Sequence, residues 1–156
     1  MGTVLFYHLT RSGAAETAAM LLPRALAQGW RVMVRGTDRG RLEWLDEKLW
    51  LGRDEDFLPH GLEGGPQDAD QPILLGLGAP VNGARALMLA DGARCTAEEA
   101  RAMERVWILF DGTDAAALEA ARAQWREVTG WGVAAQYWSE EGGRWEKKAE
   151  KAAEAG

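Results

Sequence analysis

The sequence predicts an α/β fold whose strands are mainly parallel. Short apolar runs rich in β-branched and aromatic residues alternate with longer segments that have apolar residues at helical spacing. Strands that alternate with helices in this way pair in parallel through right-handed crossovers. The chain has 156 residues, which is enough for one domain with a real core and too few for two ordinary domains.

The apolar runs define the expected strands. Each is five to seven residues long, as buried strands are. Six segments are predicted to be strands: Thr3–Leu9, Arg31–Arg35, Ile73–Leu77, Ala86–Ala90, Arg105–Phe110 and Gly132–Trp138.

Four helices are expected between these strands, because capping residues precede segments with an apolar stripe. Ser12 can cap the first helix, and either Thr37 or Asp38 opens the second. Thr96 caps a short acidic helix, and Asp114 caps the last long one, which runs to about Thr129.

Two regions lack a clear pattern. Residues 52–72 are dominated by charges, Gly and Pro, and we expect a long loop there; such loops in compact domains are often functional. From Ser139 the chain is rich in Glu, Lys, Ala and Gly, which predicts a tail that is helical in part or frayed. We therefore divide the chain into one domain, residues 1–138, and a charged C-terminal tail, residues 139–156.

Composition narrows the function. The net charge of −6 and the pI of about 5.0 argue against non-specific binding to nucleic acid, although a local basic patch is compatible with them. The single cysteine, Cys95, cannot form an intrachain disulfide. There is no signal peptide and no apolar run long enough for a membrane span, so we expect a cytoplasmic protein.

No catalytic motif is evident. The segment TRSGAAET after the first strand has one Gly and no Lys, so it is not a phosphate-binding loop, although Arg11 and Ser12 could hold an anion at the helix start. His8 and His60 have no second ligand at metal-binding spacing. We expect neither a metal nor a cofactor. A nucleotide-binding enzyme on this fold remains the alternative, and it predicts a deep polar pocket at the carboxyl ends of the strands.

The last long helix carries the strongest candidate for a binding site. Trp125 lies on its apolar face, and Arg122 and Arg126, four residues apart, flank that face. Two such cations repel each other unless an anion lies beside them. Glu119 could supply that anion internally, or an external carboxylate could do so. The sequence leaves open whether Trp125 is a core residue or an exposed one.

A second candidate lies at the end of the second helix and in the loop after it. Trp44, Trp50, Phe57 and Leu58 are large apolar residues among charged ones. They form either a satellite of the core or a surface for a partner. A further interpretation is a purely structural interaction domain that uses only the surface of Trp50 and Phe57.

At these residues the chain resembles the chi subunit family of the bacterial DNA polymerase III holoenzyme. The most specific match is LDEKLW, Leu45–Trp50, continued by DFLPHGLEGG, Asp56–Gly65. FYHL at Phe6–Leu9 and AARAQW at Ala120–Trp125 support it by their order along the chain. The resemblance covers roughly residues 3–138.

The resemblance implies a three-layer Rossmann-like domain that lacks a phosphate-binding loop and has no catalytic activity. Chi-like proteins belong to the clamp-loader assembly and grip the acidic C-terminal tail of single-stranded-DNA-binding protein, which ends in Pro-Phe. The tail-binding Arg of the family matches Arg122, its neighbouring aromatic matches Trp125, and a further basic position matches Arg126. The contact with the psi subunit, which a helicase can also use, matches Trp50 and Phe57.

These matches lead to a specific expectation for the site. Arg122 and Arg126 take the carboxylates of the tail, Trp125 and Phe110 form the slot for its last aromatic ring, and DNA is reached only indirectly through the partner. The chain departs from the family at Asp111, directly after Phe110, where the family can have an apolar residue. An acid there would weaken the binding of an acidic tail or would turn away from it.

Overall fold

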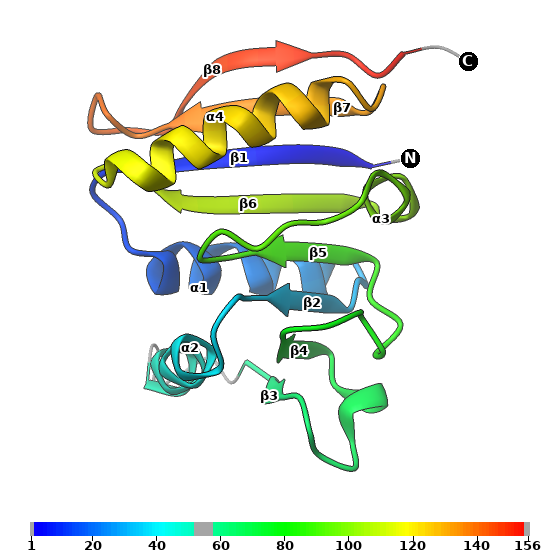
Figure 1. Cartoon of the computed structure of the whole chain (residues 1–156). Helices are drawn as coiled ribbons and strands as arrows, with labels where there is room; N and C mark the ends of the chain where they lie inside the picture. The colour runs from blue at the N-terminus through cyan, green and yellow to red at the C-terminus, as the bar shows by residue number, and fades with distance from the viewer. Residues whose placement is uncertain (1, 52–57, 155–156) are drawn as a thin grey trace.

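The computed structural model describes residues 2–51 and 58–154, and in this part of the chain a single sheet is covered by helices on both faces (Figure 1). Its elements follow in chain order: β1 Thr3–Leu9, α1 Ala14–Ala27, β2 Val32–Arg35, α2 Arg39–Leu51, β3 Gly61–Leu62, β4 Ile73–Gly76, β5 Ala86–Leu89, α3 Ala97–Ala102, β6 Arg105–Asp111, α4 Ala115–Thr129, β7 Ala134–Ser139 and β8 Glu146–Lys151. A short 3₁₀ turn, Asp68–Asp70, precedes β4.

The sheet has eight strands in the order β3-β4-β2-β5-β6-β1-β7-β8. Every pair of neighbours is parallel except β7 and β8, which are antiparallel. The predicted α/β fold with a mainly parallel sheet is therefore confirmed. The six expected strands are β1, β2, β4, β5, β6 and β7, and their bounds differ from the expected ones by two residues at most.

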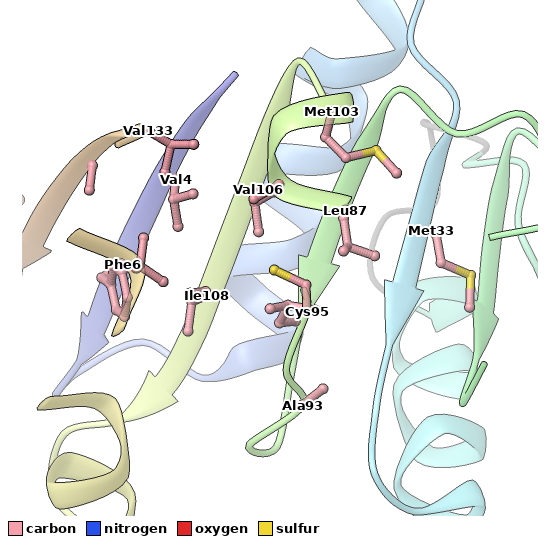
Figure 2. Packing of buried hydrophobic residues seen from close by; sticks show 14 of the residues in the cluster. Val4, Phe6, Met33, Leu87, Ala93, Cys95, Met103, Val106, Ile108 and Val133 are labelled. Carbon is pink, nitrogen blue, oxygen red and sulfur yellow. The ribbon is translucent and has the colours of Figure 1, made fainter. Parts of the chain in front are cut away.

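The helices divide between the two faces because successive side chains of each strand point to opposite sides. Along β6, Val106 and Ile108 pack in the core under α3 and α4, whereas Trp107 and Leu109 pack in the core under α1 and α2. Figure 2 shows the first of these cores, with Phe6 of β1, Val106 and Ile108 of β6 and Leu87 of β5 on the same face. The three expected layers are present.

The secondary structure predicted for the C-terminal tail was wrong. Residues 146–151 form β8, which pairs with β7 from Ser139↔Glu146 to Ala135↔Lys151. Glu, Lys and Ala favour a helix locally, but without β8 the outer edge of β7 would have no neighbour in the sheet. The alternating charges of EKKAEK suit an exposed edge strand, since charged edges resist further pairing.

Two smaller predictions also need correction. The long loop expected over residues 52–72 contains the edge strand β3 and the 3₁₀ turn; residues 52–57 lie outside the described part. Ser12 does not cap α1. Gly13 occupies the cap position, and the Ser12 hydroxyl donates a hydrogen bond to Glu140 instead. Asp38 rather than Thr37 caps α2, because its Oδ2 accepts a hydrogen bond from the Arg41 N–H.

The cap expected for the short acidic helix is present. Thr96 caps α3 and accepts a hydrogen bond from the Glu99 N–H at 3.1 Å. The helix is also fixed to the sheet, because Glu99 forms two hydrogen bonds, at 2.6 and 3.0 Å, with the buried guanidinium of Arg35 in β2. Within the described residues, no helix is both long and apolar enough to cross a membrane.

Candidate protein-binding site

Helix α4 carries the predicted tail-binding residues. It begins at the Asp114 cap, whose Oδ1 accepts a hydrogen bond from the Ala116 N–H at 3.1 Å. Ala121 and Val128 are buried against the sheet and fix which side of the helix faces inward. The opposite side of α4 faces solvent. The candidate binding residues lie along the edge between the buried side and this solvent-facing side.

Trp125 lies on that edge and is half-buried. Its ring meets Phe6 of β1 edge-on at 5.3 Å between centroids and Tyr137 of β7 edge-on at 5.8 Å. Phe110 of β6 lies 5.9 Å from Tyr137 and is only 8% exposed. The indole therefore rests on the core and keeps part of its surface in solvent. Trp125 is thus partly a core residue and partly exposed. Phe110 is more deeply buried than Trp125.

Arg122 and Arg126 are both exposed. Within residues 2–51 and 58–154, no ion pair joins either guanidinium to an acid, including Glu119. Glu127, the other acid of this helix, pairs with Arg94 instead. The two cations therefore have no internal counter-charge in the described part of the chain, although they are neighbours on one helix.

Tyr137 connects the aromatic and cationic parts of this site. Burial raises the pKa of its phenol, whereas the positive charge of Arg122 acts in the opposite direction. The hydroxyl lies 3.1 Å from Nδ1 of the buried His8, within hydrogen-bond distance. His8 in turn packs against Phe110 at 5.2 Å between ring centroids. The strand residues behind α4 thus form one connected wall of rings.

Gly112 allows this wall to form. A Cβ at position 112 would lie 1.8 Å from Cδ2 of His8, which is far inside van der Waals contact. Any larger residue would displace the His8 ring and, through it, Phe110. The first glycine after β6 is therefore required by packing.

Asp111, the departure from the family pattern, is engaged by its own turn. Its Oδ1 accepts hydrogen bonds from the Thr113 N–H at 2.9 Å and from the Thr113 hydroxyl at 2.6 Å. These two bonds lower the pKa of the carboxyl, so it stays charged at neutral pH. The acid is exposed, and its partner is the turn that leads into α4.

The second candidate surface is described only in part. Trp50, near the end of α2, is 49% exposed, and its ring lies 4.4 Å from the ring of the buried His60. The His60 ring nitrogens lie 2.6 Å from the carbonyl oxygen of Leu58 and 3.2 Å from that of Asp46. The indole is thus fixed against a buried residue while half of it faces solvent. Phe57 lies outside the described residues, so the proximity of Trp50 and Phe57 stays a prediction.

The loop between β1 and α1 contains a feature that the sequence did not reveal. The carboxylate of Glu140, just after β7, accepts hydrogen bonds from the N–H groups of Thr10, Arg11 and Ser12 at 3.1, 3.1 and 2.8 Å. It also accepts one from the Ser12 hydroxyl at 2.9 Å. Burial raises the pKa of this carboxyl, but the four hydrogen bonds outweigh burial and the pKa is lowered.

Nucleotide-binding α/β proteins hold a phosphate at this position, between the loop that follows a strand and the start of the next helix. Here the chain's own carboxylate takes the backbone donors. A groove of about 750 Å³ does lie at the carboxyl ends of β1, β5 and β6, but its walls are largely apolar. Asp91, Asp111 and Asp114 also line it, and its one Arg, Arg41, pairs with Asp91. Apolar walls and three acids are unfavourable for a triphosphate, and they oppose the nucleotide-binding alternative.

Two residues of functional interest escaped the sequence analysis. Tyr137 could have been found from the alternation of side chains along a strand. If the predicted strand Gly132–Trp138 lies beside the first strand, its alternate residues face α4. Glu140 gave no local signal, because its partners lie about 130 positions earlier in the chain.

The remaining candidates are structural. Cys95 is buried, and burial raises the pKa of its thiol to about 11, so it stays protonated at neutral pH. No group of three or more His, Cys, Asp or Glu side chains in the described residues is arranged to hold a metal ion.

Fold and site together define a class of protein. It is an α/β domain with a mainly parallel sheet, in which the chain's own carboxylate occupies the position where related folds hold a phosphate. Two exposed cations that have no acid partner in the described residues, and a half-buried indole, lie on an outer helix.

A sequence model of the family described as "DNA polymerase III chi subunit, HolC" matches residues 1–136, and the chain belongs to this family. The family consists of non-catalytic accessory subunits. The chain is also 36% identical over 78 residues to DNA polymerase III subunit chi of Pseudomonas aeruginosa (strain PAO1). That alignment covers 50% of this chain and 54% of the relative, about half the length of each. The resemblance inferred from LDEKLW and its companion motifs is confirmed at the level of the family.

Proposed function

We propose that this protein links a DNA polymerase III clamp-loader assembly to single-stranded-DNA-binding protein by holding that protein's acidic C-terminal tail. The observation that carries the proposal is the edge of α4. There, two exposed guanidinium groups without an acid partner in the described residues flank a half-buried indole. Membership of the chi family, and the name of the Pseudomonas relative, support the assignment to DNA polymerase III.

The proposed mechanism combines charge and apolar contact. Arg122 and Arg126 take the carboxylates of the tail, including the terminal one, through charge-assisted hydrogen bonds. The exposed part of the Trp125 indole receives the last aromatic ring of the tail. Phe110, being almost fully buried, contributes from below by holding Tyr137 in place.

A peptide titration tests this mechanism. A labelled acidic peptide ending in Asp-Ile-Pro-Phe is titrated with the whole protein at low and moderate salt, and binding is followed by fluorescence anisotropy. We expect saturable binding that salt weakens. Arg122→Ala should cost on the order of 1–3 kcal/mol of binding free energy, as for charge-assisted hydrogen bonds.

The matched control removes a guanidinium elsewhere. Arg101→Ala in α3 loses only a hydrogen bond to the Trp131 carbonyl and should bind the peptide as the wild type does. Salt-insensitive binding, or equal effects of the two substitutions, would overturn the proposal. A peptide with an amidated C-terminus separates the terminal carboxylate from the internal acids, and it should bind more weakly.

We further propose that Trp50, together with Phe57, receives a second protein, which is the psi subunit, another clamp-loader component or a helicase. An indole that is 49% exposed and yet rests against the ring of buried His60 is an apolar anchor of the kind that protein interfaces use. Trp50→Ala should abolish capture of that partner while leaving the tail peptide bound. Loss of both activities would indicate general unfolding and would contradict two separate surfaces.

A further inference from the structure

A pocket of about 380 Å³ lies on the sheet face opposite α4, between the C-terminal half of α1 and the strands β1 and β6. In Figure 1, α1 and α4 lie on opposite sides of the sheet. The pocket volume is at the lower end of the range found for small-molecule sites. It is lined by Tyr7, Leu21, Arg24, Ala25, Gln28, Trp30, Arg105 and Trp107.

The pocket has two cations and no acid among its lining residues. Arg24 comes from α1 and Arg105 from the first position of β6. Within the described residues, neither guanidinium forms a hydrogen bond or an ion pair. Nε of Arg105 is also buried without a hydrogen-bond partner, which is unfavourable for a charged group unless a ligand supplies an acceptor. The two guanidinium groups are therefore available to an external anion, since no acid of the described residues pairs with them.

Aromatic rings complete the pocket. The Arg105 guanidinium lies 5.6 Å from the centre of the half-buried Trp30 ring. Burial raises the pKa of the Tyr7 phenol, while Arg105 and Arg24 both act to lower it. Tyr7, Arg24 and Arg105 thus line one pocket, and both positive charges act on the phenol. Ring faces next to guanidinium groups are the composition with which proteins hold nucleotides of single strands.

We propose that this pocket binds one nucleotide of single-stranded DNA, with its phosphate between Arg24 and Arg105 and its base against Trp30. A tetrahedral phosphate has oxygens on several sides and suits two guanidinium groups that approach from different elements. A single carboxylate is planar and is satisfied by one guanidinium fork. The net charge of −6 argues against a longer contact along the strand. The site is separate from the proposed tail-binding edge of α4 and does not depend on it. It replaces the expectation that DNA is reached only indirectly through the partner.

Fluorescence anisotropy with a short labelled oligothymidylate and the whole protein tests the proposal. We expect saturable binding at low salt, and weaker binding by thymidine monophosphate as a competitor. Arg24→Ala and Arg105→Ala should each weaken oligonucleotide binding severalfold. Each should also flatten the dependence of log K on log salt by about 0.7, the value for one phosphate contact on a single strand. Arg101→Ala, on the opposite face, should do neither.

Arg24 is exposed and removing it should not disturb folding, so it keeps the test decisive if Arg105→Ala is unstable. No binding at low salt, or binding that both variants retain, would overturn the proposal. Displacement of the oligonucleotide by the acidic peptide in the wild type, but not in Arg24→Ala, would also overturn it and would assign the pocket to a carboxylate instead.

Discussion

The β1–α1 loop and the edge of α4 both attract anions, and they differ in whether the chain itself supplies the anion. At the β1–α1 loop, three backbone N–H groups and a hydroxyl converge, and Glu140 accepts hydrogen bonds from all of them. At the edge of α4, Arg122 and Arg126 are exposed and no acid of the described residues pairs with them. The first region is internally complete, and the second is open to an external partner.

The difference shows what a fold determines and what a single side chain determines. Parallel strand–loop–helix geometry directs backbone donors to the start of α1 whatever the protein does. Whether those donors remain free depends on one carboxylate contributed by the opposite end of the sequence. A local motif at the loop therefore cannot distinguish a ligand site from a structural anion, whereas cations on an outer helix remain available unless a neighbour pairs with them.

The largest effect should follow from removing the carboxylate that accepts the hydrogen bonds of the β1–α1 loop. Glu140→Ala removes a buried acceptor from four donors, which should lower the free energy of unfolding by about 3 kcal/mol. For a chain of this size we expect the melting temperature to fall by roughly 6–12 °C. Thermal or chemical denaturation measures it, and Glu119→Ala, an exposed acid on α4, is the matched control with little expected change.

If Glu140→Ala had the same melting temperature as the wild type, the carboxylate would not be a structural anion. The contrast between the two regions would then fail. If the variant instead bound inorganic phosphate and recovered its stability in phosphate buffer, the contrast would sharpen. The donors would then be shown to accept either an internal or an external anion.

The open region should behave differently, with binding and stability separable. Trp125→Ala removes a half-buried ring from Phe6 and Tyr137 and should cost about 2 kcal/mol of stability, below the range for fully buried Trp. It should also abolish peptide binding. Arg122→Ala should change stability by less than about 0.5 kcal/mol while weakening binding. Denaturation and peptide titration of both variants test this, and a large stability loss in Arg122→Ala would contradict an unpaired cation.

Low pH should weaken the hydrogen bonds that Glu140 accepts at the β1–α1 loop. The folded-state pKa of Glu140 is lowered from its ordinary value of 4.5, so its stabilisation is complete above that value. It is lost as the pH falls through the lower, folded-state pKa. Glu99, whose pKa is lowered by Arg35, contributes in the same direction. Glu140→Gln should therefore show a shallower loss of stability between neutral and acid pH than the wild type, measured by urea denaturation across the range. Parallel curves would show that Glu140 does not titrate with folding.

Elements with short-range causes were predictable from the sequence. The strands Thr3–Leu9 and Arg105–Asp111 follow from apolar runs, and α3 and α4 follow from Thr96 and Asp114 at their caps. The family was predictable too, because LDEKLW and the run DFLPHGLEGG that follows it are specific. The sequence also placed Arg122 and Trp125 on neighbouring positions of one helix, where the structure has them.

Features with long-range causes were not predictable in the same way. β8 has the composition of a helix and becomes a strand because β7 offers a partner, a fact that depends on strand order. Glu140 reaches a loop near the start of the chain, and Tyr137 joins the site only because β7 lies beside β1. In each case the deciding contact joins segments whose spatial neighbourhood is set by the whole sheet.

The smallest expected effect concerns the acid beside the open region. Asp111 is exposed and accepts two hydrogen bonds from Thr113, and Asn can still accept them. Asp111→Asn should therefore leave the turn intact and remove only a screened negative charge near the approaching tail. We expect peptide binding to strengthen by about 0.5 kcal/mol at low salt and by less at moderate salt, as for exposed charges. A gain that persists at high salt would mean that Asp111 lies inside the peptide contact. In that case the open region would extend across the end of β6 as well as along α4.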